Sequence, residues 1–307
     1  MVYDALIKRF YMNFLGYAHC FMSIIISHMK DHSISVYQSR YATSIVDDYL
    51  DTATVKTVKK VIYYKKFTKA DASTSDDQVE KLTREFNIHY GDCIGSLIYL
   101  LYTRVYLSFA LQKLERFSSN TGKVHFEGLI HLLRYIRDNV TLGLNCYTDM
   151  KDSLLYDLLR QANIKNENQL MALSDYSWQD FPDTGRSTGA CIIFYQDVPI
   201  NHATHVPGQV SQSSTESDYN SACTAGMALA HFRVLLHEFL NRDPDIVPEE
   251  YPLIILDRNY DFCMAENGKD SKHNRHIFRG VHVVRNGEKL KMHKIDLCEG
   301  GMQLSDI

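Results

Sequence analysis

Two aspartates follow apolar segments at positions where α/β proteins place binding sites. Asp175 comes directly after the apolar run at 170–174, and Asp257 comes directly after the run at 253–256. Each run has the length of a strand, and the second is apolar throughout, which is typical of a strand buried on both faces. Because sites in open α/β sheets form just outside the carboxyl ends of strands, these carboxylates would share one site if their strands are neighbours. The other interpretation is that each aspartate only begins a turn or caps a helix.

A third carboxylate, Asp218, is expected on the buried side of a helix. The helix should begin at Ser213 or Ser214, because Ser213 and Glu216 have the spacing of a capping box. Asp218 lies four residues before Ala222, the first residue of the apolar stripe, and a buried carboxylate is costly unless it is paired or binds a cation. Three converging carboxylates suit Mg²⁺ or Mn²⁺, and two such ions can activate water and stabilise the leaving oxygen of a phosphodiester.

The composition allows this chemistry without pointing to it. The chain has 307 residues, enough for two domains, and its 45% hydrophobic and 23% charged residues are typical of soluble globular protein. The net charge of −4 neither indicates nor excludes nucleic-acid binding, because local basic patches matter more than the sum. Seven scattered cysteines without a C-x-x-C pair argue against a zinc site and a disulfide framework. The apolar stretch at 14–27 is too short and interrupted for a membrane span, and we expect no signal peptide.

The pattern along the chain changes near residue 160. Before it, we expect a buried strand at 21–26 and helices at 41–50, 94–117 and 125–137, with a turn at 118–122. Polar breaks at 70–78 and 145–167 are expected to be loops. After it, we expect two strands that pair with each other, at 190–195 and 199–206, and a helix at 229–240. Together with the apolar strands at 170–174 and 253–256, these elements predict an α/β domain.

The motifs that carry the aspartates resemble a known family. Residues 173–180 (L-S-D-Y-S-W-Q-D), 186–189 (R-S-T-G) and 213–219 (S-S-T-E-S-D-Y) are similar to the ribonuclease H region of Pol polyproteins from copia-type LTR retrotransposons (Pseudoviridae). Residues 256–259 (L-D-R-N), 274–277 (N-R-H-I) and 304–307 (L-S-D-I) continue the match in the family's order and spacing. The resemblance implies a ribonuclease H-like mixed sheet with flanking helices.

The first half resembles the segment that follows the polymerase palm in this family. The matching residues are 14–16 (F-L-G), 38–42, 94–104, 119–126 and 133–136. The I-V-D-D sequence at 45–48 is not a polymerase motif, because it lies after the F-L-G segment rather than before it. We therefore expect residues 1–160 to form a mainly helical thumb/connection-like remnant without a palm, and 161–307 to form a ribonuclease H-like domain truncated at its C-terminus.

The resemblance also implies a site and its partners. Four aspartates would be the catalytic and metal-binding residues for two Mg²⁺ or Mn²⁺ ions: Asp175, Asp218, Asp257 and Asp306. Contacts with an RNA–DNA hybrid are expected from six residues: Arg186, Ser187, Thr188, Lys272, Arg275 and His276. The chain would originally have been part of a larger Pol polyprotein, intracellular in the cytoplasm or in a virus-like particle, with no membrane partner.

Two functions remain open from the sequence. The first is a ribonuclease H that cleaves the RNA strand of RNA–DNA hybrids with divalent metal, and ancestry favours this enzyme. The second is a catalytically inactive retrotransposon remnant that at most binds nucleic acid. Asp218 favours the second, because it stands where the family has glutamate and is one methylene shorter.

Two further groups of residues are open to interpretation. The lysines and aromatic residues between 56 and 69 form either a nucleic-acid-binding segment or a solvated loop or edge strand. His202 and His205, with no third ligand in view, are expected to be surface residues.

Overall fold

The computed structural model describes residues 7–298 with gaps. The residues within this range that it does not describe are 8, 12, 14–15, 51–55, 62, 64–66, 150, 152, 162–169, 178–180, 182, 207, 209, 212, 240–251, 258–277 and 291. In the part of the chain that is described, no helix is long and apolar enough to span a membrane.

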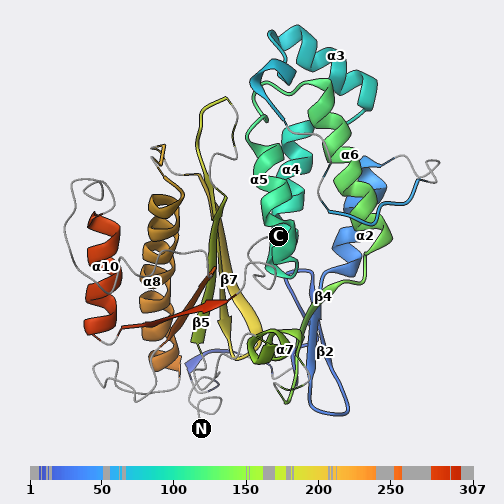
Figure 1. Ribbon diagram of the computed structural model, residues 1–307. Helices are drawn as coiled ribbons and strands as arrows, with labels where there is room; N and C mark the ends of the chain where they lie inside the picture. Colours follow the sequence, from blue (N-terminus) through green and yellow to red (C-terminus); the bar gives the residue numbers. More distant parts are fainter. Residues whose placement is uncertain are drawn as a thin grey trace.

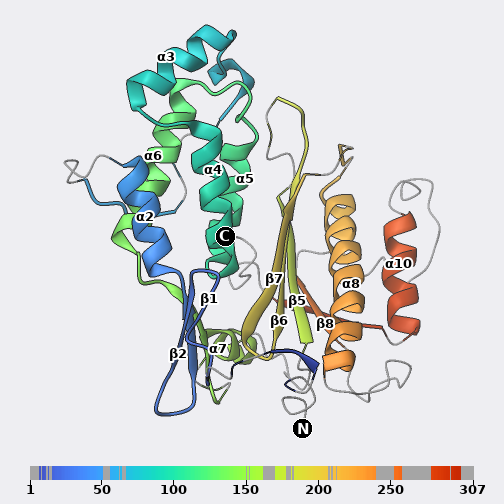
Figure 2. The same cartoon turned by 180° about the vertical axis from the view of Figure 1, so that it is seen from behind.

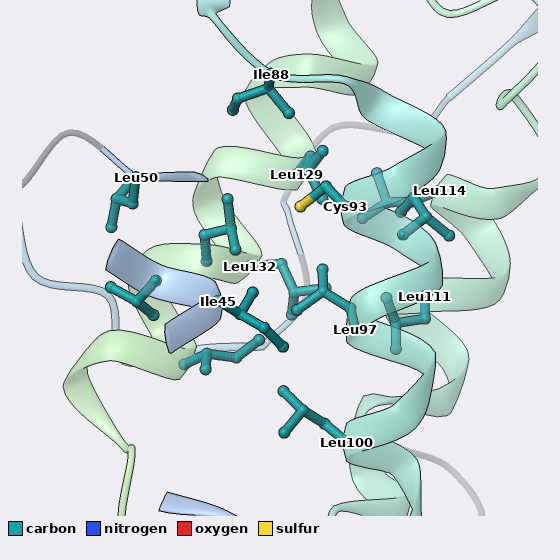
Figure 3. Packing of buried hydrophobic residues seen from close by; sticks show 14 of the residues in the cluster. Ile45, Leu50, Ile88, Cys93, Leu97, Leu100, Leu111, Leu114, Leu129 and Leu132 are labelled. Atoms are coloured by element: carbon teal, nitrogen blue, oxygen red, sulfur yellow. The ribbon is translucent and has the colours of Figure 1, made fainter. Parts of the chain in front are cut away.

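Helices make up most of the first part of the chain (Figure 1). They are α2 (Ser39–Tyr49), α3 (Asp76–Phe86), α4 (Tyr90–Ile98), α5 (Ser108–Glu115) and α6 (Lys123–Asp138). Figure 3 shows their shared core, to which Leu97 of α4, Leu111 of α5 and Leu132 of α6 contribute. Leu97 and Leu129 are fully buried, and the expected helices at 41–50 and 125–137 are confirmed by α2 and α6.

The expected single helix at 94–117 is wrong, because the chain turns in its middle. Helix α4 ends at Ile98, and the 3-10 turns Tyr99–Tyr102 and Val105–Leu107 precede α5. The physical reason is a pair of buried polar residues: Thr103 donates its hydroxyl hydrogen to Gln38 Oε1 at 2.8 Å, and Arg104 donates to the Val140 carbonyl at 2.7 Å. These tertiary contacts hold the turn between the two helices.

The expected loop at 70–78 is only partly correct. A 3-10 turn, Lys69–Asp71, lies at its start, and α3 already begins at Asp76. Asp76 and Asp77 occupy the first turn of α3, where acidic residues are favoured by the helix dipole. The polar residues at 70–78 therefore include the start of a helix as well as a loop.

A four-stranded antiparallel sheet accompanies the helices. Its strands, in the order in which they pair, are β1 (Cys20–Phe21), β2 (Ile24–His28), β3 (Ile34–Tyr37) and β4 (Gly143–Cys146). The expected buried strand at 21–26 is only partly correct, because Met22 and Ser23 have positive φ angles of 47° and 63° and turn the chain, so that half-buried β2 begins at Ile24. The expected loop at 145–167 is also partly wrong, because it contains the end of β4 and helix α7 (Leu154–Gln161).

The second part of the chain is built on a five-stranded mixed sheet. Its strands are β5 (Leu170–Ser177), β6 (Thr188–Tyr195), β7 (Val198–His205), β8 (Leu253–Asp257) and β9 (Lys294–Cys298), in the order β7-β6-β5-β8-β9. Strands β5, β6 and β7 are antiparallel neighbours, whereas β8 is parallel to both β5 and β9. Helix α8 (Ser214–Phe239) covers the sheet and α10 (Phe278–Lys289) packs beside α8 (Figure 1).

Both faces of this sheet are covered, which explains the uninterrupted apolar runs. Alternate residues of the strands, Ala172 and Ile254 among them, pack with Leu229 of α8. The residues between them, such as Leu173, pack with Leu155 of α7 in a separate cluster. The expected strand pair 190–195 and 199–206 is confirmed by β6 and β7, and the mixed α/β sheet with flanking helices is confirmed as a whole.

The two parts of the chain contact each other along α5 and β7, which Figure 2 shows facing each other. The backbone N–H of Lys69 donates to Asp183 Oδ2 at 2.7 Å. The Arg116 guanidinium lies 4.0 Å from the centre of the buried Phe181 ring, a cation–π contact. Residues from both parts therefore hold the interface together.

Candidate active site at the carboxyl ends of β5 and β8

Asp175 and Asp257 occupy equivalent positions on neighbouring parallel strands. The register pairs Met171 with Leu253 and Leu173 with Ile255, and each aspartate lies two residues further along its strand. The expectation that the two strands are neighbours is therefore confirmed. Asp175 is half-buried and still paired with Ala190, so it lies inside β5 and not after its end as the sequence suggested.

The start of helix α8 brings the third aspartate to the same region of the fold. Helix α8 begins at Ser214, and the Glu216 N–H donates to Ser213 Oγ at 3.1 Å, so the expected helix start and its cap are confirmed. Asp218 lies in the second turn of α8. Its side chain and that of Asp257 are outside the described residues, so their orientation stays a prediction.

Four serine side chains attach this end of α8 to the sheet. Ser221 Oγ donates to the Asp175 carbonyl oxygen at 3.2 Å and also contacts Ser174 Oγ. One turn earlier, Ser217 Oγ lies 3.2 Å from Ser187 Oγ. All four serines are at least 99% buried. Asp218 therefore sits between two points at which its helix is bonded to β5 and to the residue that precedes β6.

Sequence reasoning missed these serine contacts. Ser217 and Ser221 are four residues apart, which places them on one side of the helix, and that spacing is the signal that could have found them. Ser174 interrupts an otherwise apolar strand face. The partners of each hydroxyl depend on how the helix lies on the sheet.

The residues expected to contact nucleic acid fall into three groups. Arg186 is exposed just before the start of β6. Ser187 and Thr188 are 1% and 3% exposed, and Ser187 bonds to α8, so their hydroxyls face the protein interior. Lys272, Arg275 and His276 lie outside the described residues, as does Asp306. Arg186 is thus accessible to a ligand, whereas contacts from the other residues stay predictions.

The metal site has to be judged from the donors that the fold brings together. Among the described side chains, no three His, Cys, Asp or Glu residues form a group that could hold a metal ion. The side chains of Asp218 and Asp257 lie outside the described residues, so this absence does not extend to them. Asp257 lies at the equivalent position on the strand next to Asp175, and the helix that carries Asp218 is bonded to the Asp175 backbone. Carboxylate oxygens are the donors that Mg²⁺ and Mn²⁺ prefer, so a shared metal site at these three residues stays a prediction.

His202 and His205 on β7 are half-buried, so the prediction that they are surface residues is only partly correct. Burial lowers the pKa of both imidazoles. Tyr176 Oη lies 3.4 Å from His205 Nε2, and the two rings meet edge to face over Gly189. A Cβ atom at Gly189 would clash with the Tyr176 ring, so a larger residue there would have to displace that ring.

The segment from 56 to 69 follows helix α6 in its described part. His131 Nε2 lies 2.9 Å from the Lys60 carbonyl oxygen, and Tyr63 donates to Glu127 Oε2 at 3.1 Å. Lys56, Lys59 and Lys60 are exposed. The described part of the segment is thus attached to α6, and nucleic-acid binding by its lysines stays a prediction.

The fold of the second part defines the class of protein. Parallel β5, β8 and β9 with antiparallel β6 and β7, covered by helices on both faces, form the ribonuclease H-like α/β architecture that the motifs implied. Ribonuclease H1 from the halophilic archaeon Halobacterium salinarum aligns with a TM-score of 0.34 and 11% identity over 45% of this chain and 91% of its own. A ribonuclease H domain from Mycobacterium tuberculosis aligns with a TM-score of 0.31 and 7% identity over 44% of this chain and 84% of its own. Because these scores are below 0.5, the assignment rests on strand topology and motifs.

Sequence relatives identify the family. The Pol polyprotein of transposon RE1 from Arabidopsis thaliana is 27% identical over 197 residues, 64% of this chain and 12% of that protein. The Pol polyprotein of transposon TNT 1-94 from Nicotiana tabacum is 24% identical over 225 residues, 72% of this chain and 15% of its own length. An uncharacterized mitochondrial protein of Arabidopsis thaliana is 33% identical over 95 residues, 31% of this chain and 71% of its own length. No family model matches the chain.

The chain belongs to the same family as that mitochondrial protein, and its homologues are the retrovirus-related Pol polyproteins of copia-type transposons. It spans only 12 to 15% of the length of the Pol polyproteins it matches.

Proposed function

We propose that residues 161–307 form a metal-dependent ribonuclease H that cleaves the RNA strand of RNA–DNA hybrids. The observation that carries the proposal is the equivalent placement of Asp175 and Asp257 on adjacent parallel strands, with the Asp218 turn of α8 bonded to the Asp175 backbone. Carboxylates from two neighbouring strands and one helix would form the kind of oxygen-rich site that two-ion phosphodiester hydrolysis requires. The Pol ancestry of the relatives supports the same reaction class.

Each residue has a role in this proposal. Asp175, Asp218 and Asp257 would hold two Mg²⁺ or Mn²⁺ ions, with Asp306 as a further ligand. When bound, the ions supply an activated water and stabilise the charge on the leaving oxygen. Exposed Arg186 would pair with a backbone phosphate of the hybrid. Further contacts would come from the basic segment after β8, in which two cations bind phosphate and a histidine assists product release: Lys272, Arg275 and His276.

The test is cleavage of a hybrid whose RNA strand is end-labelled, with Mg²⁺ or Mn²⁺ present. We expect cleavage by the native protein and almost none by Asp175→Asn, which keeps the size of the side chain but removes its charge. The same strands as duplex DNA and duplex RNA serve as controls. Equal product from the native protein and Asp175→Asn would refute the proposal.

A second candidate function is metal-independent binding of nucleic acid by an inactive remnant. The observation that favours it is aspartate at position 218, whose carboxylate reaches about 1.5 Å less far than that of glutamate, the length of one carbon–carbon bond. This candidate predicts that hybrid binding is the same with Mg²⁺ and with a chelator. If Asp218→Glu creates cleavage that the native protein lacks, the scaffold is intact and only the ligand has been lost.

The setting of this activity follows from the same ancestry. We propose that residues 1–160 are a thumb/connection-like module, without a polymerase palm, that positions the hybrid for the ribonuclease H-like part. The contacts of Lys69 with Asp183 and of Arg116 with Phe181 support a fixed arrangement of the two. The chain would act within a larger Pol polyprotein, in the cytoplasm or in a virus-like particle.

A further inference from the structure

Buried hydroxyl groups lie on both sides of Asp218 in helix α8. Ser217 precedes it directly and Ser221 follows it by three residues, and the two are 0% and 1% exposed. Each has a hydrogen-bond partner on the sheet side, Ser187 for Ser217 and the Asp175 carbonyl oxygen for Ser221. A buried hydroxyl without a partner destabilises the folded state, so these contacts resist displacement of the helix.

The two contacts define how the helix lies against the sheet. Their anchors are separated by about 6 Å along the helix axis, roughly one turn of helix. Two anchors on one side of a helix restrict both its sliding along β5 and its rotation about its own axis. Ala222 and Ala225, both fully buried, follow on the same side, and their small side chains allow close approach to the sheet. The backbone at Asp218 is therefore fixed relative to Asp175.

We infer that Ser217 and Ser221 are positioning residues that hold α8 close enough to β5 for the short carboxylate of Asp218 to share a divalent cation with Asp175. This inference rests on the proposed function, because it assumes that the two aspartates bind metal. It gives the serines a role beyond filling the core. If the helix moves away from the sheet, an aspartate loses the ion, whereas the longer glutamate can still reach it.

The experiment is a double-mutant cycle read out by Mn²⁺ affinity, measured from the electron paramagnetic resonance signal of free Mn²⁺. The first arm is Ser217→Ala combined with Ser221→Ala, the second is Asp218→Glu, and the third combines all three changes. We expect the serine variant to bind Mn²⁺ about 10-fold to 100-fold more weakly, as for other residues that orient metal ligands. Adding Asp218→Glu to it should restore most of that loss.

The matched control is Thr224→Ala on the same helix. Thr224 is half-buried, and its Oγ1 donates to the Asn220 carbonyl at 2.9 Å, so its hydroxyl is bonded to the helix itself. This change should leave Mn²⁺ affinity unchanged. Thermal unfolding of every variant shows whether it is folded. If the double serine variant does not fold, the single change Ser217→Ala replaces it, because that change keeps Ser221 in contact with Ser174 and Asp175.

The outcomes separate this inference from the proposed function. Unchanged Mn²⁺ affinity in the folded serine variant, together with loss of binding in Asp175→Asn, overturns the positioning role and leaves the metal site standing. A serine variant that binds weakly but is not restored by Asp218→Glu also overturns it, because the serines then act by a route other than the reach of residue 218. A native protein that binds no Mn²⁺ overturns the proposed function and the inference together.

Discussion

His125, in the first turn of α6, should make the stability of this protein depend on pH. Its side chain is 0% exposed, its Nδ1 accepts the Gly122 N–H at 2.9 Å, and its ring stacks on Phe117 with a centroid distance of 4.0 Å. Among the described residues its Nε2 has no hydrogen-bond partner. Burial lowers the pKa of this imidazole from 6.5 to about 4, against a smaller opposing effect of the Asp71 charge.

The sign of the effect follows from where the proton binds. Between pH 6.5 and about 4, the unfolded chain holds a proton on His125 that the folded chain does not, so folding becomes less favourable as the pH falls through this window. At about 1.4 kcal/mol for each pH unit, the free energy of unfolding should fall by about 3 kcal/mol. Protonation would also remove the acceptor of the Gly122 N–H.

The assay is urea unfolding at several pH values between about 4 and 7.5, a range that covers the window between the two pKa values, followed by far-UV circular dichroism. His125→Gln is the matched variant, because a glutamine three residues after a helix cap can accept the same N–H but does not titrate. Its free energy of unfolding should fall less steeply than that of the native chain as the pH is lowered. Parallel curves for the two proteins would refute the assignment of this pH dependence to His125.

Two glycine substitutions, one at buried Gly128 of α6 and one at exposed Gly95 of α4, should have opposite effects on the free energy of unfolding, measured in the same urea experiment. Gly128→Ala should lower the free energy of unfolding, because the new Cβ would lie 2.6 Å from Cζ of the Phe67 side chain and 3.1 Å from Leu114 Cδ2. A stability equal to that of the native chain would show that this contact relaxes freely. Gly95→Ala should raise the free energy of unfolding by about 0.5–1 kcal/mol, because alanine is favoured over glycine inside a helix. In the described part of the chain, nothing outside its own helix lies within 4 Å of the new Cβ. A decrease would contradict the open surroundings of Gly95.

Much of the second part of the chain could be predicted from its sequence. Strands β5 and β8 are buried on both faces, so their apolar runs are long enough to identify. The start of α8 followed from Ser213, whose capping bond is local in sequence. The sequence could only suggest that Asp175 and Asp257 are neighbours, because strand order depends on long-range pairing.

The remaining features depend on contacts between distant residues. The break between α4 and α5 is held by Gln38 and Val140, which lie far from Thr103 and Arg104 in the sequence. Helix α3 has no buried residue, so burial places little constraint on its sequence. The serine contacts of α8 could not be predicted either, because a hydroxyl accepts many partners and only the packing of helix on sheet selects one.

The central claim is that Asp175, Asp218 and Asp257 surround one divalent metal site. The most direct test is to replace Mg²⁺ with Fe²⁺ in the full chain, generate hydroxyl radicals at the bound ion with ascorbate and peroxide, and map the backbone cuts by mass spectrometry. We predict cuts clustered around residues 175, 218 and 257, suppressed by excess Mg²⁺ and absent in Asp175→Asn. Cuts at other positions, or the same three clusters in Asp175→Asn, would contradict the claim.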